Sequence, residues 1–139
     1  DITYGIIVHQ VNCQGVMGAG LALSIRNKYP RVYYEYKSYC LNNTININEG
    51  VIQLSLVSDS PLYICNLFSQ EYYGRKNNYT NYNALKLALR KLNICNTLNL
   101  PLYLPYGMGA GLAGGDWSKV SKIINEATPN LNIILYEYK

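Results

Sequence analysis

The sequence has few of the residues from which metal sites are built. Among 139 residues there is one histidine and there are eight acidic residues, which are dispersed along the chain. Such spacing predicts no oxygen cage for a cation. The four cysteines lie far apart and lack the C-x-x-C spacing of zinc sites. We therefore expect no metal and no cofactor, and unpaired thiols fit a reduced, cytoplasmic setting.

Long apolar runs and long charged runs are also missing. No stretch reaches the roughly 20 apolar residues of a membrane-spanning helix, and nothing resembles a secretory leader. The net charge is +4, and Lys and Arg are scattered among Asn and Tyr, which gives no electrostatic footprint for nucleic acid. We expect a soluble monomer that binds neither membranes nor nucleic acid.

The length and the apolar content together predict one domain over residues 1–139. About half of the chain is hydrophobic, which is enough to bury a real core. Neither repeats nor a linker divide it. The sequence runs from Asp1 almost directly into a strand, so we expect a few residues of the natural protein to precede it.

Strand and helix patterns alternate along the chain. Short apolar runs predict strands at 5–8, 50–54, 62–68, 100–105 and 133–136. Helical spacing predicts helices over 19–29, 32–41 and 82–92, and a further helix that Asp116 or Ser118 caps. The segments 9–20, 42–49 and 106–115 are expected to be loops. This alternation is typical of an α/β fold with three layers, in which helices cover both faces of a largely parallel sheet.

Two glycine-rich segments carry the chemistry. Residues 12–20 (NCQGVMGAG) and 106–115 (YGMGAGLAGG) each follow a strand and precede a helix. Loops at this position present main-chain N–H groups and a helix N-terminus, which suit a phosphate group. Neither segment has the G-K-[ST] ending of a Walker loop or the context of a dinucleotide fingerprint. Two such loops favour one shared diphosphate ligand over glycines that only make turns.

These motifs resemble the macrodomain family over essentially the whole chain. Val8-His9-Gln10-Val11-Asn12 is similar to its V-N-x-x-N pattern, and Asp1-Ile2-Thr3 to its G-D-[IL] signature without the glycine. The resemblance implies an α/β/α macrodomain with a mixed sheet that binds ADP-ribose or a derivative. It implies that Asp1 and Ile2 lie by the adenine, that Asn12 faces the distal ribose and that Tyr136 stacks on adenine. The implied diphosphate loops comprise Gly15, Val16, Met17, Gly18, Ala19, Gly20 and Leu21, and Pro105, Tyr106, Gly107, Met108, Gly109, Ala110, Gly111 and Leu112.

The subgroup resembled is the one with the pattern G-x-M-G-x-G-[IL]-A, and two departures from it bear on activity. This subgroup includes phosphatases of ADP-ribose 1''-phosphate and hydrolases that release ADP-ribose from glutamate or from DNA. Gln70 stands where those hydrolases have a lysine, and Ala113 where the glutamate hydrolases have an aspartate. Lys76 is a candidate for a shifted lysine. The phosphatase is therefore our first hypothesis, beside a binding module without catalysis and a hydrolase that acts on protein or DNA.

Three residues are candidates for the chemistry of a phosphatase. Asn12 is expected to fix the distal ribose, His9 to act as acid or base with a titration near neutral pH, and Asp116 to orient water. For Asn12 we expect a role in binding, whereas the other two residues have structural alternatives. His9 can instead be a buried strand-end residue that hydrogen-bonds to the backbone, and we favour Asp116 as a helix cap over a catalytic group.

Overall fold

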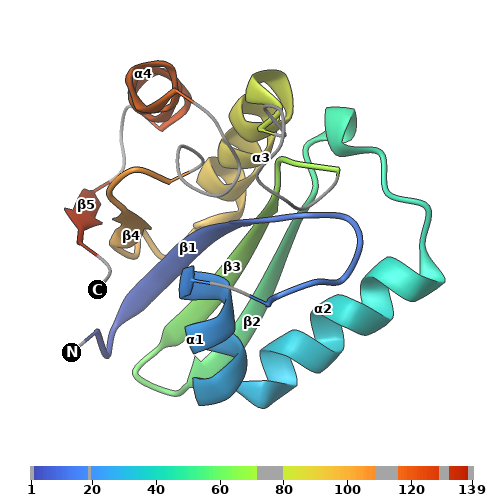
Figure 1. Cartoon of the computed structure of the whole chain (residues 1–139). Coiled ribbons are helices and arrows are strands. Elements are labelled where there is room, and N and C mark those ends of the chain that lie inside the picture. The colour runs from blue at the N-terminus through green and yellow to red at the C-terminus, as the bar shows by residue number, and fades with distance from the viewer. Residues whose placement is uncertain (1, 19, 72–79, 109–115, 129–131, 138–139) are drawn as a thin grey trace.

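The computed structural model describes residues 2–18, 20–71, 80–108, 116–128 and 132–137. In these ranges the chain forms a sheet of five strands in the order β2-β3-β1-β4-β5 (Figure 1). The strands are β1 Gly5–Val11, β2 Ile52–Ser58, β3 Leu62–Phe68, β4 Leu102–Pro105 and β5 Ile133–Tyr136.

The sheet is mixed and mostly parallel. Strand β1 pairs in parallel with β3 and with β4, and β4 pairs in parallel with β5, whereas β2 is antiparallel to β3. The carboxyl ends of β1, β3, β4 and β5 therefore lie at one edge of the sheet, which we call the carboxyl edge. In α/β sheets of this kind ligands bind at such an edge.

Helices cover both faces of the sheet, which confirms the predicted three-layer α/β fold (Figure 1). Helices α1 Gly20–Lys28 and α2 Pro30–Asn42 lie on one face, and α3 Tyr82–Cys95 and α4 Trp117–Ala127 lie on the other. Side chains alternate along a strand. On β1, Ile6 and Val8 accordingly pack with α3 and α4, and Ile7 packs with α1 and α2.

The larger part of the core lies between the sheet and the α3–α4 layer. Its fully buried side chains recur at helical spacing on α3 and at alternate positions on the strands. They include Leu85, Leu89 and Leu92 with Val8, Leu67, Leu102 and Leu104. Each buried side chain of this size contributes roughly 1.5–3 kcal/mol of transfer free energy. The Asn81 side chain caps α3 because it accepts a hydrogen bond from the Ala84 N–H at 3.0 Å.

Several element boundaries differ from those predicted. Strand β1 continues to Val11, through residues that were expected to be loop, because His9 and Gln10 hydrogen-bond to side chains beyond β1. Strand β2 begins at Ile52 and runs to Ser58, beyond the predicted end at residue 54. A 3-10 turn, Ile47–Glu49, interrupts the predicted connection, and it forms because Asn46 caps it and Ile47 is buried.

No helix in the described ranges is both long enough and apolar enough to cross a bilayer.

Candidate functional site

The described parts of the two glycine-rich segments, residues 12–18 and 106–108, lie at the same edge of the sheet. The first follows β1 and the second follows β4, and these strands are neighbours that run in parallel. The first loop also touches the segment after β3, because the Cys13 N–H donates to the Glu71 carbonyl at 3.2 Å. Residues 109–115, with Asp1 and Ala19, lie outside the described residues, and so do Lys76 and Ala113.

Backbone conformation explains a glycine in each loop. Gly15 has a φ of 76° and Gly107 a φ of 81°, and side-chain-bearing residues rarely adopt such values. A Cβ on Gly107 would meet no atom within 4 Å, so conformation and not space requires glycine there. In the described part of the chain, the N–H groups of Met17, Gly18 and Gly107 donate no hydrogen bond. Donors of this kind are free to bind an anion.

Asn12 holds the first loop in shape. Its Oδ1 accepts hydrogen bonds from the Gln14 N–H at 2.9 Å and, at a longer 3.4 Å, from the Val16 N–H. Its Nδ2 donates to the Val16 carbonyl at 2.9 Å. The Tyr36 hydroxyl donates to the Asn12 carbonyl oxygen at 2.6 Å and also lies 2.9 Å from Oδ1. Asn12 is only 5% exposed, so its amide orders the loop.

Tyr36 is a site residue that sequence reasoning missed. Its spacing from Val32 indicated only a buried helix position, and the ring is indeed fully buried against Phe68. Burial raises the pKa of its hydroxyl well above the ordinary value, so the group stays protonated and keeps its donor. The strand and the loop of the site are thereby fastened to α2.

Three of the expected ligand-binding side chains point into the core. Met17 packs with Tyr33 and Phe68 beneath α2, and Met108 packs in the cluster beneath α3 and α4. Leu21 packs against Ile25 on the α1 face.

His9 is buried in a polar row across the sheet. Its Nε2 lies 2.6 Å from Oδ1 of Asn66, its register partner on β3, and the Asn66 Nδ2 donates to Oε1 of Gln53 on β2 at 3.1 Å. Since the Asn66 Oδ1 can only accept a hydrogen bond, the His9 Nε2 carries the proton. Burial lowers the pKa of His9 to about 4, although the hydrogen bond to Asn66 opposes this shift. The expected titration near neutral pH is therefore wrong, and the imidazole is neutral at pH 7.

Gln70, which replaces the lysine of related hydrolases, belongs to a neutral cluster on the opposite face. The Gln10 Nε2 donates to Oε1 of Gln70 at 2.6 Å and to Oγ1 of Thr80 at 3.1 Å. All three side chains are buried or half-buried. The position at which the resemblance implies a lysine is thus occupied by a neutral amide, and Gln10, which donates to it, is neutral as well.

Asp116 caps α4, as favoured from the sequence. Its Oδ1 accepts a hydrogen bond from the Ser118 N–H at 2.9 Å, and its own N–H donates to the Tyr82 hydroxyl at 2.9 Å. The carboxylate is exposed and stands at the N-terminus of α4, beyond the second glycine loop.

Replacing Asp116 with Ala is expected to destabilise the fold by about 1 kcal/mol, since a helix cap is lost. Asp116→Asn keeps the capping oxygen and is expected to retain the stability of the original chain within about 0.5 kcal/mol. Urea denaturation of both variants measures this difference. Equal stability of the two variants would show that the cap contributes nothing.

The remaining predicted residues lie along β4 and β5. Pro105 is buried and pairs with Tyr136 in the register, and the Tyr106 N–H donates to the Tyr136 carbonyl at 2.7 Å. The Tyr106 ring is exposed and contacts the Trp117 ring in a tilted arrangement, with centroids 5.0 Å apart and 52° between the ring planes. Tyr136 and Ile2 are half-buried. An aromatic side chain thus stands at the end of β5, two strands from the first loop.

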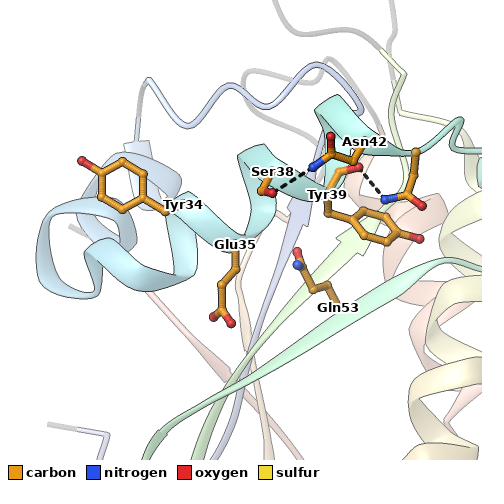
Figure 2. Close-up of a pocket in the computed structure, with 7 residues that line it drawn as sticks. Tyr34, Glu35, Ser38, Tyr39, Asn42 and Gln53 are labelled. Carbon is orange, nitrogen blue, oxygen red and sulfur yellow. Dashed lines mark hydrogen bonds between the residues drawn. The ribbon is translucent and has the colours of Figure 1, made fainter.

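An open hollow of about 520 Å³ lies on the outside of the molecule, between α2 and β2 (Figure 2). Figure 2 shows Gln53 beneath Ser38 and Tyr39, with Asn42 bonded to Ser38. The residues that line it are mostly exposed, and the side-chain oxygen of Gln53 already accepts a hydrogen bond from Asn66. None of the residues predicted to bind ligand lines this hollow.

Comparison with known proteins supports the interpretation of the fold. No family model matches the sequence. The chain is 26% identical over 159 residues to an ADP-ribose 1''-phosphate phosphatase of Saccharomyces cerevisiae, covering 95% of this chain and 89% of that protein. It is 27% identical over 137 residues to the DNA ADP-ribosyl glycohydrolase of Mycobacterium tuberculosis, covering 94% of this chain but only 37% of that protein. The chain therefore spans little more than a third of the mycobacterial relative.

Among solved structures, the macrodomain of Thermus aquaticus DarG superposes with a TM-score of 0.78 and 26% identity, over 98% of this chain and 90% of that one. The mixed sheet of this chain, with helices on both faces, has the fold of a macrodomain. The resemblance predicted from the sequence motifs is confirmed.

Proposed function

We propose that the protein binds ADP-ribose or a derivative across the carboxyl edge and hydrolyses the 1''-phosphate monoester. The main observation behind this proposal is that the glycine-rich segments follow neighbouring parallel strands. Within the described residues, the N–H groups of Met17, Gly18 and Gly107 have no acceptor. Main-chain N–H groups at such positions bind phosphate oxygens without a charged side chain. A diphosphate between the two loops satisfies donors from both.

The strand order gives the ligand a direction. Tyr136, the proposed adenine partner, ends β5, the two loops follow β4 and β1, and Asn12 lies between β1 and the segment after β3. From β5 to β3 there are three strand spacings, or about 14 Å. An extended ligand with adenine at β5 and its distal ribose towards β3 fits this span.

The phosphate ester is the preferred substrate because Gln70 stands at the position where the resemblance implies a lysine for release of ADP-ribose from protein or DNA. Gln70 is neutral, and Gln10 binds its oxygen. In the proposed reaction Asn12 shapes the loop that holds the ribose, and the Asp116 carboxylate orients the attacking water. The neutral His9 supports the strand and does not donate a proton at pH 7.

A binding module without catalysis is the second candidate. The structural roles of His9 and Asp116 favour it. His9 lies in a buried row of hydrogen-bonded side chains, and Asp116 caps a helix. Such a protein would recognise or sequester an ADP-ribose-type nucleotide.

Incubation with ADP-ribose 1''-phosphate tests the first candidate, with free phosphate as the measurement. We expect release above the buffer background, and we expect Asp116→Asn to lose at least about 100-fold in rate, as for removal of a catalytic carboxylate. Because Asp116→Asn keeps the helix cap, a loss of rate does not arise from unfolding.

Calorimetry with ADP-ribose separates the candidates. Micromolar affinity without phosphate release supports the binding module and overturns the phosphatase. Absence of both binding and release overturns the proposal for this site as a whole.

A further inference from the structure

Two buried polar atoms at the carboxyl edge have no hydrogen-bond partner within the described residues. They are Oε1 of Gln10 and Oγ of Ser69, and Ser69 has no exposed surface. A buried polar atom without a partner is costly and uncommon, since most such atoms in folded proteins are paired. Two such atoms at a candidate ligand site indicate that a ligand supplies the missing hydrogen bonds.

The two side chains are neighbours on the α3 face of the sheet. Gln10 on β1 lies opposite Leu67 on β3, and Ser69 follows two residues after Leu67. Because strand side chains alternate, Gln10, Leu67 and Ser69 share one face. Val11 pairs with Phe68, so Ser69 lies level with Asn12.

Fixed contacts hold both groups in place. The Gln10 Nε2 donates to Gln70 and to Thr80, which leaves Oε1 as the free end of the amide. The Ser69 carbonyl accepts the Asn81 N–H at 2.7 Å, which anchors its backbone at the start of α3. The two bonds of the Gln10 Nε2 fix the orientation of that amide, and the backbone bond fixes the position of Ser69 in the chain.

We propose that Gln10 and Ser69 are specificity-determining residues that recognise hydroxyl groups of the ring distal to the diphosphate. This inference rests on the proposed function, which puts that ring towards β3. An amide oxygen accepts a hydrogen bond from one hydroxyl, and a serine hydroxyl both donates and accepts, so the pair matches a neutral diol. It offers no charge to a phosphate. Both atoms are buried in the ligand-free chain, so the proposed contact requires the side chains that cover them to move aside.

The consequence is a preference for ADP-ribose over ADP, which lacks the distal ring. A site that leaves buried polar atoms unpaired discriminates strongly against an analogue without the matching hydroxyl. The glycine loops bind the diphosphate of both ligands, so only the ring contact differs between them.

Calorimetry of ADP-ribose and ADP on the original chain and on Ser69→Ala tests the inference. We expect Ser69→Ala to weaken ADP-ribose about tenfold, the value of one hydrogen bond, and to change ADP affinity less than about twofold. The melting temperature is expected not to fall, because the substitution removes an unpaired hydroxyl. Gln10→Met, a second variant of similar volume, is expected to act in the same direction.

Ser55→Ala is the matched control, since Ser55 is a buried serine on β2, and both affinities are expected to stay unchanged. Unchanged ADP-ribose affinity in Ser69→Ala, or an equal loss for both ligands, overturns the inference and leaves the proposed function standing. If the original chain binds ADP-ribose no better than ADP, the inference is likewise overturned and the proposed function stands. An original chain that binds neither ligand overturns the proposed function and this inference with it.

Discussion

Lowering the pH from 7 to 4 is expected to destabilise the folded protein by roughly 3 kcal/mol through His9 alone. Burial lowers the pKa of this imidazole from 6.5 to about 4 in the folded chain, whereas the unfolded chain keeps the ordinary value. Between these values the unfolded state binds a proton that the folded state does not. Stability is therefore complete above pH 6.5 and falls as the pH drops towards 4.

His9→Asn isolates this contribution. Asparagine does not titrate, and its amide N–H is able to donate to Asn66 Oδ1 as the imidazole does. Urea denaturation at pH 7, 5.5 and 4 is the measurement. The carboxylates titrate in both proteins, so the difference between the two curves reports His9. We expect the variant to lose roughly 3 kcal/mol less than the original chain between pH 7 and pH 4. Parallel curves would show that His9 is not buried as a neutral group.

The same burial bears on catalysis. An imidazole whose pKa is about 4 is neutral at pH 7, so very little of the imidazolium form that acts as a general acid is present. The sequence places His9 beside the glycine loop and so suggests an acid or base. Only the fold shows that its side chain points to the α2 layer and bonds to Asn66, because the partner is 57 residues away.

Most of the fold is predictable from local patterns. The strand 62–68 and the strand 133–136 were predicted with the bounds that the structure has, because apolar runs there are flanked by polar residues. The end of β1 was not predicted correctly, since His9 and Gln10 are polar residues typical of a loop. In the structure their side chains hydrogen-bond to partners on other elements. Polar residues within a sheet mislead a reading based on hydrophobicity.

The candidate site was predictable as two loops but not as a network. Glycine spacing and the strand order place the loops at one edge, as expected. Tyr36, Ser69 and Thr80 carry no motif, and their part at this edge depends on helix and strand packing that brings distant segments together. Residues of this kind are found only once the register of the sheet is known.

Replacing Asn12 with Asp is expected to weaken the binding of ADP-ribose by about 100-fold or more. The new carboxylate keeps an acceptor for the Gln14 and Tyr36 donors, so the first loop retains most of its contacts. It loses the Nδ2 donor to the Val16 carbonyl and brings a negative charge beside the proposed diphosphate. Two charges about 4 Å apart near a protein surface repel by up to about 4 kcal/mol, and 100-fold in affinity corresponds to about 2.7 kcal/mol.

Calorimetry with ADP-ribose measures this loss, and Asn99→Asp is its matched control. Asn99 lies before the amino end of β4, at the opposite edge of the sheet, and has a φ of 52°, which Asp also tolerates. The same change of charge at that edge is expected to alter affinity less than about twofold, since salt screens distant charges. If Asn12→Asp binds as tightly as the control, no anion lies beside the first glycine loop, and the diphosphate must be sought elsewhere on the molecule.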